Sequence, residues 1–370
     1  MTVGKTIASK AARTVQEISK NQHLPNNSRV FSLIQPTGKF HIGNYLGAIQ
    51  SWKTLSETES PGTQYIFGIA DLHAITTGVK PAGELRSNRH EAMAGILSCG
   101  LNPKKCILFH QSSVPEHAEL HWYLTCLTSM GALNRMTQWK SKARQLGDDE
   151  SDQLKFLEHT KAGLLCYPIL QAADILIYRS THVPVGDDQS QHLEMCRSVA
   201  INFNNSYKTN FFPIPQTLLT PSKKILSLRN PLKKMSKSDP DQSSCIYITD
   251  APEVIAKKIR KATTDSVQGP VYFDPEARPG VSNLINILSG VTSQSIEQVV
   301  EDLAYVKDHK QFKDHVTDVL VTEFKQQREL FEELMKDGVY LEKVCHEGRD
   351  KAREIATKNI EEVRKLIGMD

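Results

Sequence analysis

The chain has 370 residues, enough for two ordinary domains, and its hydrophobic fraction of 39% suits a globular enzyme. No apolar run approaches the length of a membrane span, so we expect no membrane partner. Seven cysteines without a Cys-x-x-Cys pair favour free thiols over a metal or iron–sulfur site. The net charge of +3 neither requires nor excludes RNA, because RNA binding needs a basic face rather than a basic whole.

Residues 1–28 differ from the rest of the chain. Four basic residues face a single acid, Glu17, and apolar residues from Val3 to Ile18 recur at near-helical spacing. A basic, amphipathic, acid-poor start is typical of mitochondrial targeting segments. We therefore predict a location in the mitochondrial matrix. The alternative is an N-terminal extension of a cytoplasmic enzyme.

Strand and helix patterns alternate from residue 28 to about residue 219. The predicted strands are 30–34, 65–69 and 106–109, and the predicted helices are 83–98, 116–130 and 193–202. Alternation of this kind predicts an α/β fold with a doubly wound parallel sheet and ligands at the carboxyl ends of its strands.

Residues 35–44 read Gln-Pro-Thr-Gly-Lys-Phe-His-Ile-Gly-Asn and follow the first predicted strand. Pro36 and Gly38 end that strand, and a helix is predicted from Gly43 to about residue 56. Helix N-termini attract anions, Gly43 lets a ligand approach the backbone, and His41 is placed to donate to a phosphoryl oxygen. The alternative is an ordinary connection with a surface histidine.

Residues 167–176 are apolar except for Gln171 and Asp174. An acid within an apolar helix is costly to bury unless something pairs with it. Asp174 is therefore either a capped or salt-bridged structural acid, or an acceptor for a ligand donor such as an indole N–H. The string Val-Pro-Val-Gly-Asp-Asp-Gln follows at 183–189, and another helix is predicted from about Gln189.

Residues 234–238 read Lys-Met-Ser-Lys-Ser, with two ammonium groups and two hydroxyls in five residues. Such a segment suits phosphate, which both kinds of group bind. The alternative is a solvated basic turn. A basic connection, 221–234, leads into this loop, which we expect to move between open and closed states.

From about residue 250 the apolar spacing becomes helical. The predicted helices are 251–262, 282–288, 295–303, 308–334 and 341–367. The basic run 257–261 is a candidate RNA-binding face, with a solvated helix surface as the alternative.

Residues 41–44 and 234–238 resemble the two signature segments of class I aminoacyl-tRNA synthetases. Residues 183–189, with 71–76, 135–140 and 279–284, are similar to tryptophanyl-tRNA synthetases in particular. Leu33 and Gln171 depart from the bacterial pattern, in which a glycine and a methionine are common.

The resemblance implies a Rossmann-like catalytic domain over 29–240, with a helical insertion at about 115–165, and a C-terminal α-helical anticodon-binding domain over 241–370. It implies ATP-dependent ligation of L-tryptophan to tRNA(Trp) through an adenylate, with release of pyrophosphate and AMP. A homodimer, and Mg²⁺ bound through the ATP phosphates rather than at a protein metal site, are also implied. The alternatives are a tyrosyl-specific ligase, a small-molecule adenylyltransferase, or a synthetase-derived RNA-binding protein without catalysis.

The resemblance also assigns roles to residues. The residues implied to bind tryptophan are Asp174, Gln35, His73, Tyr167, Val183, Val185 and Gln189. The residues implied to bind ATP are Gln35, Pro36, Thr37, His41, Gly43, Asn44, Gly186, Asp187, Asp188, Ile225, Lys234, Met235, Ser236, Lys237 and Ser238. Those implied to act in catalysis are Lys234, Lys237, Lys142 and His41, through contacts to phosphate.

Overall fold

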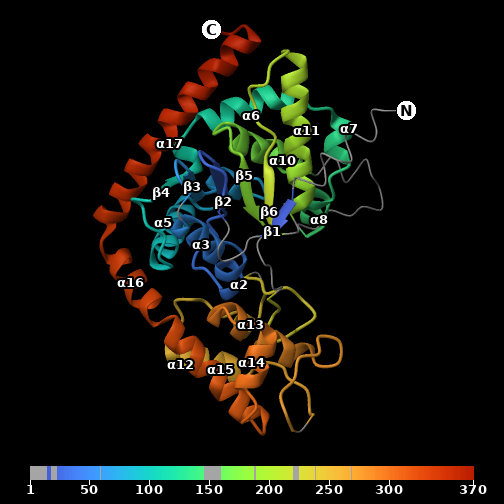
Figure 1. Ribbon diagram of the computed structural model, residues 1–370, viewed down its shortest axis with the longest axis vertical. Coiled ribbons are helices and arrows are strands. Elements are labelled where there is room, and N and C mark those ends of the chain that lie inside the picture. The colour runs from blue at the N-terminus through green and yellow to red at the C-terminus, as the bar shows by residue number, and fades with distance from the viewer. Residues whose placement is uncertain are drawn as a thin grey trace.

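The structure is a computed structural model, and it describes residues 15–17, 23–58, 60–145, 160–186, 189–219, 225–237, 239–267 and 269–370. It has two lobes (Figure 1). The upper lobe contains a β-sheet with helices on both faces, and the lower lobe consists of helices and loops. The first half of the chain builds most of the upper lobe.

The sheet has six strands, all paired in parallel, in the order β1-β6-β5-β2-β3-β4. The strands are β1 (Val15–Glu17), β2 (Arg29–Ile34), β3 (Gln64–Ile69), β4 (Cys106–His110), β5 (His182–Val185) and β6 (Gln216–Leu219). The predicted parallel α/β fold is confirmed. β1 lies within the segment 1–28 that the sequence assigns to targeting.

The middle of the sheet contains a topological switch point. Val30 of β2 is in register with Tyr65 of β3 on one side and with His182 of β5 on the other. The chain continues from β2 to β3 and β4 in one direction, whereas β5 and β6 lie in the other. A crevice at the carboxyl ends of β2 and β5 is where such sheets bind ligands.

Helices cover both faces of the sheet because alternate residues of its strands point in opposite directions. Val30 and Phe67 belong to one apolar cluster, in which Phe67 stacks on Trp52 at 4.6 Å. Phe31 and Ile66 belong to the other cluster. The upper helices are α3 (Gln50–Glu57), α5 (Ala82–Ser98), α6 (Glu116–Cys126), α7 (Met130–Asn134), α8 (Thr137–Gln145), α10 (Ala162–Leu176) and α11 (Ser190–Ser206).

The helix predicted from Gly43 to residue 56 forms in three parts. A short α2 (Ile42–Asn44) leads into a π-helical turn, η1 (Tyr45–Ile49), and then into α3. π-turns inside helices are rare and often lie at functional sites. This one directly follows the segment that the sequence assigns to phosphate.

The lower lobe contains α12 (Pro252–Arg260), α13 (Pro279–Thr292), α14 (Ile296–Asp302) and α15 (His309–Glu323). The single helix predicted over 308–334 is wrong, because the chain breaks at Phe324 before α16 (Lys325–Lys336). Phe324 is buried against the edge of Tyr45, at 5.4 Å between rings. This contact redirects α16 toward α5 of the upper lobe.

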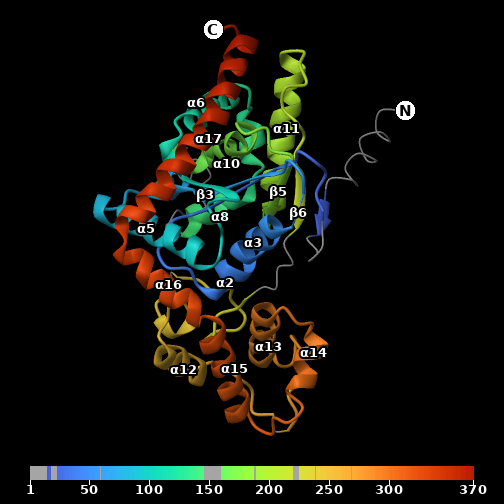
Figure 2. The ribbon, with the colours of Figure 1, turned by 60° about the vertical axis from the view of Figure 1, so that its left-hand side comes forward.

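Helix α16 leads out of the lower lobe, and the last helix, α17 (Gly338–Ile367), runs along the upper one (Figures 1 and 2). It packs on β4, α5 and α6, and its Gly348 lies so close to β4 that an added Cβ would meet the Leu108 carbonyl oxygen. The region 241–370 therefore reaches both lobes, and the proposed domain boundaries stay predictions. Within the described residues, no helix is long and apolar enough to cross a membrane.

Candidate active site

Lys237 reaches across to the loop that follows β2. Its Nζ donates to Thr37 Oγ1 at 2.9 Å, to the Thr37 carbonyl oxygen at 3.2 Å and to the Gly38 carbonyl oxygen at 3.3 Å. The same ammonium lies 5.6 Å from the centre of the Phe40 ring. Two segments separated by nearly two hundred residues thus meet at one cation.

Burial lowers the pKa of Lys237 to about 8, and the more distant charge of Glu91 opposes this shift only in part. The ammonium has neutral oxygens as its hydrogen-bond partners in this structure. An anionic phosphate in their place would stabilise its charge, because charge-assisted hydrogen bonds are stronger than neutral ones.

His41 caps the short helix α2. Its Nδ1 accepts from the Asn44 amide at 3.2 Å, and the Asn44 side chain accepts from the His41 amide, also at 3.2 Å. Burial, with the nearby charges of Lys237 and Lys234, lowers the pKa of His41 to about 3. The ring is therefore neutral at physiological pH, and because Nδ1 accepts, the ring proton lies on Nε2 as a donor.

Gly43 lies close to both His41 and Ile225. A Cβ added to Gly43 would lie 2.8 Å from the His41 ring and 3.9 Å from Ile225 Cβ. Glycine is required here because any side chain would displace the capping ring. The structure thus brings Ile225 beside the predicted nucleotide-binding residues.

The loop carrying Lys234 and Lys237 is held at its base. Met235 donates its amide to the Ile225 carbonyl at 3.0 Å, and Lys234 forms an antiparallel bridge with Leu226. Asn283 of α13 accepts from the Leu226 amide at 2.8 Å. Lys234 itself is exposed. These contacts fix the start of the loop, and Lys237 extends from it to the loop after β2.

Asp174 lies in α10, with only 1% of its surface exposed. Its Oδ1 accepts from Gln111 Nε2 and from His117 Nδ1, both at 2.7 Å. Its Oδ2 accepts from His73 Nε2 at 2.8 Å. Asp174 lies inside α10, so it is not a helix-capping acid. The alternative of a salt-bridged structural acid stays open, because His73 and His117 lie within ion-pair distance of its carboxylate.

Burial alone would raise the pKa of Asp174, but hydrogen bonds from His117 and His73 outweigh it and hold the pKa below its usual range. The carboxylate is therefore ionised at physiological pH. An ionised carboxylate only accepts hydrogen bonds, so each of its three partners must donate.

A second set of polar side chains lies beside Asp174. Tyr167 Oη lies 3.0 Å from His192 Nε2, and His192 Nδ1 lies 3.0 Å from Gln189 Oε1. Lys142 Nζ stands over the Tyr167 ring at 4.3 Å from its centre. The predicted pocket residues Tyr167 and Gln189 and the predicted cation Lys142 are thus linked. Gln171 Nε2 also reaches Gln189 Oε1, at 3.4 Å.

The two sides of the crevice lie on neighbouring strand ends. The Ala70 amide donates to the Ile34 carbonyl at 2.8 Å, which joins the end of β2 to the turn before α4 (Asp71–Ala74). Gln35 follows Ile34, and His73 lies in α4. On the other side of β2, Ser32 Oγ donates to the Pro184 carbonyl of β5 at 3.2 Å.

The remaining predicted residues fall as follows. Val183 is buried in β5 and Val185 is half-buried at its end, followed by Gly186. Pro36 and Met235 are buried, Ser236 is half-buried, and Gln35 is exposed. Asp187, Asp188 and Ser238 lie outside the described residues, as does most of the polar stretch 145–152. Their predicted roles stay predictions.

Sequence reasoning missed three residues of the site: Gln111, His117 and His192. Gln111 directly follows β4, where the rule for parallel sheets places ligand-binding side chains, so it had a detectable signal. His117 and His192 lie in the first turns of α6 and α11, without any distinguishing pattern. In the described part of the chain, no group of three or more His, Cys, Asp or Glu is placed to hold a metal ion.

A doubly wound sheet with a cationic loop over its carboxyl edge defines a nucleotide-binding α/β enzyme. Comparison with known proteins is more specific. Residues 24–325 match the family described as tRNA synthetases class I (W and Y). The chain is 52% identical over 371 aligned residues to the mitochondrial tryptophan–tRNA ligase of Saccharomyces cerevisiae, with 98% of each chain covered.

Two solved structures agree with this result. Tryptophanyl-tRNA synthetase from Mycoplasma pneumoniae aligns with a TM-score of 0.80 and 32% identity, over 93% of this chain and 98% of its own. The Campylobacter jejuni enzyme, solved with ADP and tryptophan, aligns with a TM-score of 0.74 and 30% identity, over 92% and 99%. The chain belongs to the class I tRNA synthetases of the tryptophan and tyrosine family.

Proposed function

We propose that this enzyme ligates L-tryptophan to its tRNA in two steps, of which the first consumes ATP to form an adenylate and the second transfers the amino acid to the tRNA. The observation that carries this proposal is Asp174, an ionised and buried acceptor at the carboxyl edge of the sheet. Indole has a single polar group, its N–H donor, and an acceptor in an apolar wall selects for it. The relatives of known activity named above act on tryptophan, which agrees with this choice.

ATP binds on the other side of the crevice, along the loop after β2 and under the loop of residues 234–237. Thr37, Gly43 and Asn44 line its path, and Ile225 faces the adenine. Lys237, Lys234 and Lys142 bind the phosphates. Support comes from the contact between Lys237 and Thr37, because that cation already sits over the loop where the phosphates would lie.

The implied Mg²⁺ would be held through the ATP phosphates and water, which this ion prefers to an all-protein cage. When bound, it neutralises charge on the phosphates. The protein's own contribution is a set of cations and backbone donors.

The first step needs no nucleophile or base from the protein. An oxygen of the tryptophan carboxylate attacks the α-phosphorus, the bond to the bridging oxygen breaks, and pyrophosphate leaves with the electron pair. Catalysis is then positioning together with stabilisation of charge on phosphoryl oxygens. The neutral His41 donates from Nε2, and Lys237 supplies positive charge.

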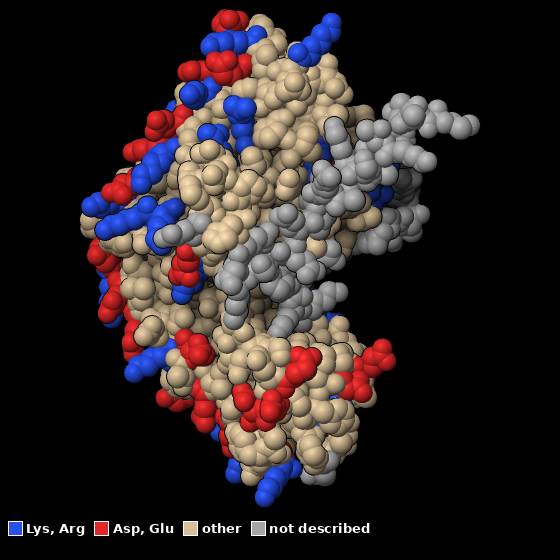
Figure 3. Space-filling view, viewed as in Figure 1, with Lys and Arg blue, Asp and Glu red and all other residues tan. Residues whose placement is uncertain are grey.

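In the second step a ribose hydroxyl at the end of the tRNA attacks the adenylate carbonyl, and AMP leaves. The helical lower lobe contacts the anticodon. Among the charged side chains on the face of this lobe seen in Figure 3, Asp and Glu predominate, so RNA should bind elsewhere. The candidate basic run offers Lys257, Arg260 and Lys261 to solvent, whereas Lys258 is buried and paired with Asp250 at 2.6 Å.

The enzyme acts as a homodimer through the surface around α6 and α7. Trp122 of α6 is 63% exposed and Met130 of α7 is 64% exposed. Large exposed apolar side chains of this kind mark interaction sites in soluble proteins. Sedimentation of the intact enzyme and of Trp122→Glu tests this, and an unchanged oligomeric state in the variant would overturn it.

The enzyme works in the mitochondrial matrix. This is supported by the basic, acid-poor segment 1–28 and by the mitochondrial relative in yeast. Cleavage after import should spare Leu24, because this residue is 5% exposed and belongs to the core. The intact mass of the protein isolated from mitochondria tests both points.

The activity is tested by pyrophosphate exchange with tryptophan, tyrosine and phenylalanine in turn. We expect exchange with tryptophan only, followed by charging of organellar tRNA. Exchange driven by tyrosine would replace the proposal with tyrosine ligation. A folded protein that shows no exchange with any of the three amino acids would instead favour an RNA-binding protein without catalysis.

A further inference from the structure

We propose that His117 is a positioning residue for tryptophan selection, because it fixes the Asp174 carboxylate so that Oδ2 keeps one open acceptor position for the indole N–H. This inference rests on the proposed function. His117 is fully buried, with Nδ1 at 2.7 Å from Asp174 Oδ1 and Nε2 at 2.8 Å from Tyr178 Oη.

The number of acceptor positions on Asp174 is limited. An ionised carboxylate offers about four lone-pair positions, two on each oxygen. Gln111 and His117 occupy both positions on Oδ1, and His73 occupies one on Oδ2. One position on Oδ2 remains. Rotation of the carboxylate would break these hydrogen bonds, so the open position has a fixed direction.

The proton arrangement on His117 is also fixed. Because Asp174 only accepts, Nδ1 of His117 carries a proton, and the other ring nitrogen, Nε2, is held by the Tyr178 hydroxyl at 2.8 Å. Burial raises the pKa of Tyr178 well above its usual value, so this hydroxyl keeps its proton. The Tyr178 ring is held by stacking on Phe31 at 5.3 Å.

Gln111 is oriented in the same way. The Leu72 amide donates to Gln111 Oε1 at 3.1 Å, which turns the NH₂ group toward Asp174. Both donors on Oδ1 are therefore held from behind by a second partner. Networks in which each member is satisfied are rigid, and they keep their geometry when a ligand enters.

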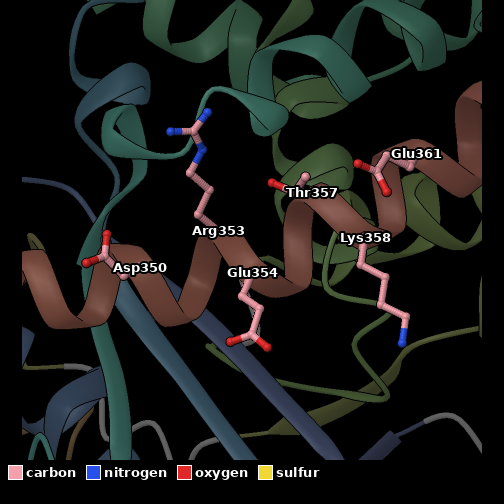
Figure 4. A pocket seen from close by; sticks show the side chains of 6 residues that line it. All are labelled: Asp350, Arg353, Glu354, Thr357, Lys358 and Glu361. Atoms are coloured by element: carbon pink, nitrogen blue, oxygen red, sulfur yellow. The ribbon is translucent and has the colours of Figure 1, made fainter.

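The C-terminal helix fixes the backbone that carries this network. Arg353 Nε and Thr357 Oγ1 of α17 donate to Glu116 Oε1 at 3.2 and 2.9 Å, directly before His117. Asn359 Nδ2 donates to the Ile177 carbonyl at 2.7 Å, directly before Tyr178. Figure 4 shows Arg353 and Thr357 on the side of α17 opposite Glu354 and Lys358. The open hollow at α17 is lined by residues of both sides of this helix, and none of the residues that surround Asp174 lines it.

Two substrates isolate the role of the N–H group. L-tryptophan and 3-benzothienyl-L-alanine have nearly the same shape, but sulfur replaces the N–H in the second. The measured quantity is the ratio of their kcat/KM values in pyrophosphate exchange. A general loss of stability lowers both values together, whereas a misplaced acceptor lowers only that of tryptophan.

Two substitutions of His117 place a side-chain NH₂ donor at different distances from Asp174. In His117→Asn the side-chain NH₂ takes the place of Nδ1 and still reaches Asp174. In His117→Gln it takes the place of Nε2, near Tyr178, and Asp174 loses its donor. We expect Asn to keep the substrate ratio within about threefold and Gln to lower it about 10–100-fold, as for loss of one hydrogen bond to a charged group. The KM for ATP should not change in either variant.

Tyr178→Phe keeps the aromatic packing and removes only the hydroxyl that orients His117. We expect a smaller fall in the ratio, about threefold to tenfold. Tyr123→Phe is the matched control, because Tyr123 lies on α6 and donates to Glu119 at 2.7 Å, away from Asp174. This control should leave the ratio unchanged.

Equal ratios in wild type, His117→Gln and Tyr178→Phe would overturn the inference while leaving tryptophan ligation in place. A wild-type enzyme that uses both substrates equally well would instead overturn the assigned role of Asp174. If the His117 variants do not fold, the comparison of Tyr178→Phe with Tyr123→Phe decides the question.

Discussion

The two sides of the crevice differ in how firmly their key charges are held. Asp174 is buried and takes three hydrogen bonds, and its partners His117 and Gln111 each have a further partner of their own. Lys237 lies on a half-buried loop, and its ammonium contacts carbonyl and hydroxyl oxygens of the loop after β2. One side is a network of buried hydrogen bonds, and the other is a half-buried ammonium bound to neutral oxygens.

This difference matches two tasks. Selection of an amino acid requires an acceptor whose position does not change when the wrong ligand enters, which a closed network provides. Phosphoryl transfer requires positive charge aimed at the place where negative charge develops, and Lys237 supplies a cation beside the loop that follows β2. Each prediction below changes one side and leaves the other as its internal reference.

Asp174→Ala should produce the largest effect. The indole N–H loses its acceptor, and discrimination against analogues without a donor should fall on the order of 10⁴-fold. ATP affinity should change by no more than a few-fold. Tryptophan titrations in pyrophosphate exchange measure this. Glu119→Gln, which alters a carboxylate of α6 paired with Arg364 at 2.6 Å, is the control. A normal KM for tryptophan would remove Asp174 from the pocket.

Lys237→Met should act on the other side. Loss of one charged donor to the transition state should slow adenylate formation about 10²–10³-fold, with tryptophan affinity nearly unchanged. Rapid-quench measurement of the first turnover tests it. Lys233→Met removes an exposed ammonium from the same loop and serves as the control. An unaltered rate constant in Lys237→Met would show that the loop cation has no part in the chemistry.

Much of this arrangement follows from local sequence. The strands at 30–34, 65–69 and 106–109 form as expected, since short apolar runs bounded by turns have few alternatives. Asp174 could be singled out because a charge in an apolar helix needs a partner. The contact of Lys237 with Thr37 agrees with the expectation that both segments bind one ligand.

Other features depend on long-range packing that periodicity does not encode. The break at Phe324 arises from its contact with Tyr45, nearly three hundred residues away. His117 acquires its role from Asp174 on another helix, and α17 reads as a member of the helical domain although it packs on β4. A helical pattern gives the apolar face of such a segment but not its partner.

The pH dependence of ATP binding should follow Lys237. Its pKa of about 8 in the ligand-free enzyme means that the ammonium is charged below pH 8 and loses its proton as the pH rises through 8. ATP binds the charged form, so its affinity should fall by up to about tenfold per pH unit above 8. Asp174 should contribute no change in tryptophan affinity over this range, because its pKa lies far below it.

Calorimetric titration with a non-hydrolysable ATP analogue between pH 7 and 9.5 measures this dependence. Lys237→Met has no proton to lose and should bind the analogue weakly, with little change over the same range. Equal slopes for wild type and variant would assign the titration to another group.

The smallest predicted effect tests how the sheet edge is built. Gly43→Ala brings a Cβ to within 2.8 Å of the His41 ring, which must leave the Asn44 amide, and loss of such a cap costs about 1 kcal/mol. Gly47→Ala, one turn further on in η1, meets no atom within 4 Å and should be neutral or stabilising by about 0.5–1 kcal/mol. Urea unfolding of Gly43→Ala and Gly47→Ala measures the difference in their free energies of unfolding.

ATP affinity should fall only in Gly43→Ala, because only that change moves the His41 ring, which donates to phosphate. Equal behaviour of the two variants would mean that His41 is not held by its cap, and the nucleotide side would then be looser than its hydrogen bonds indicate.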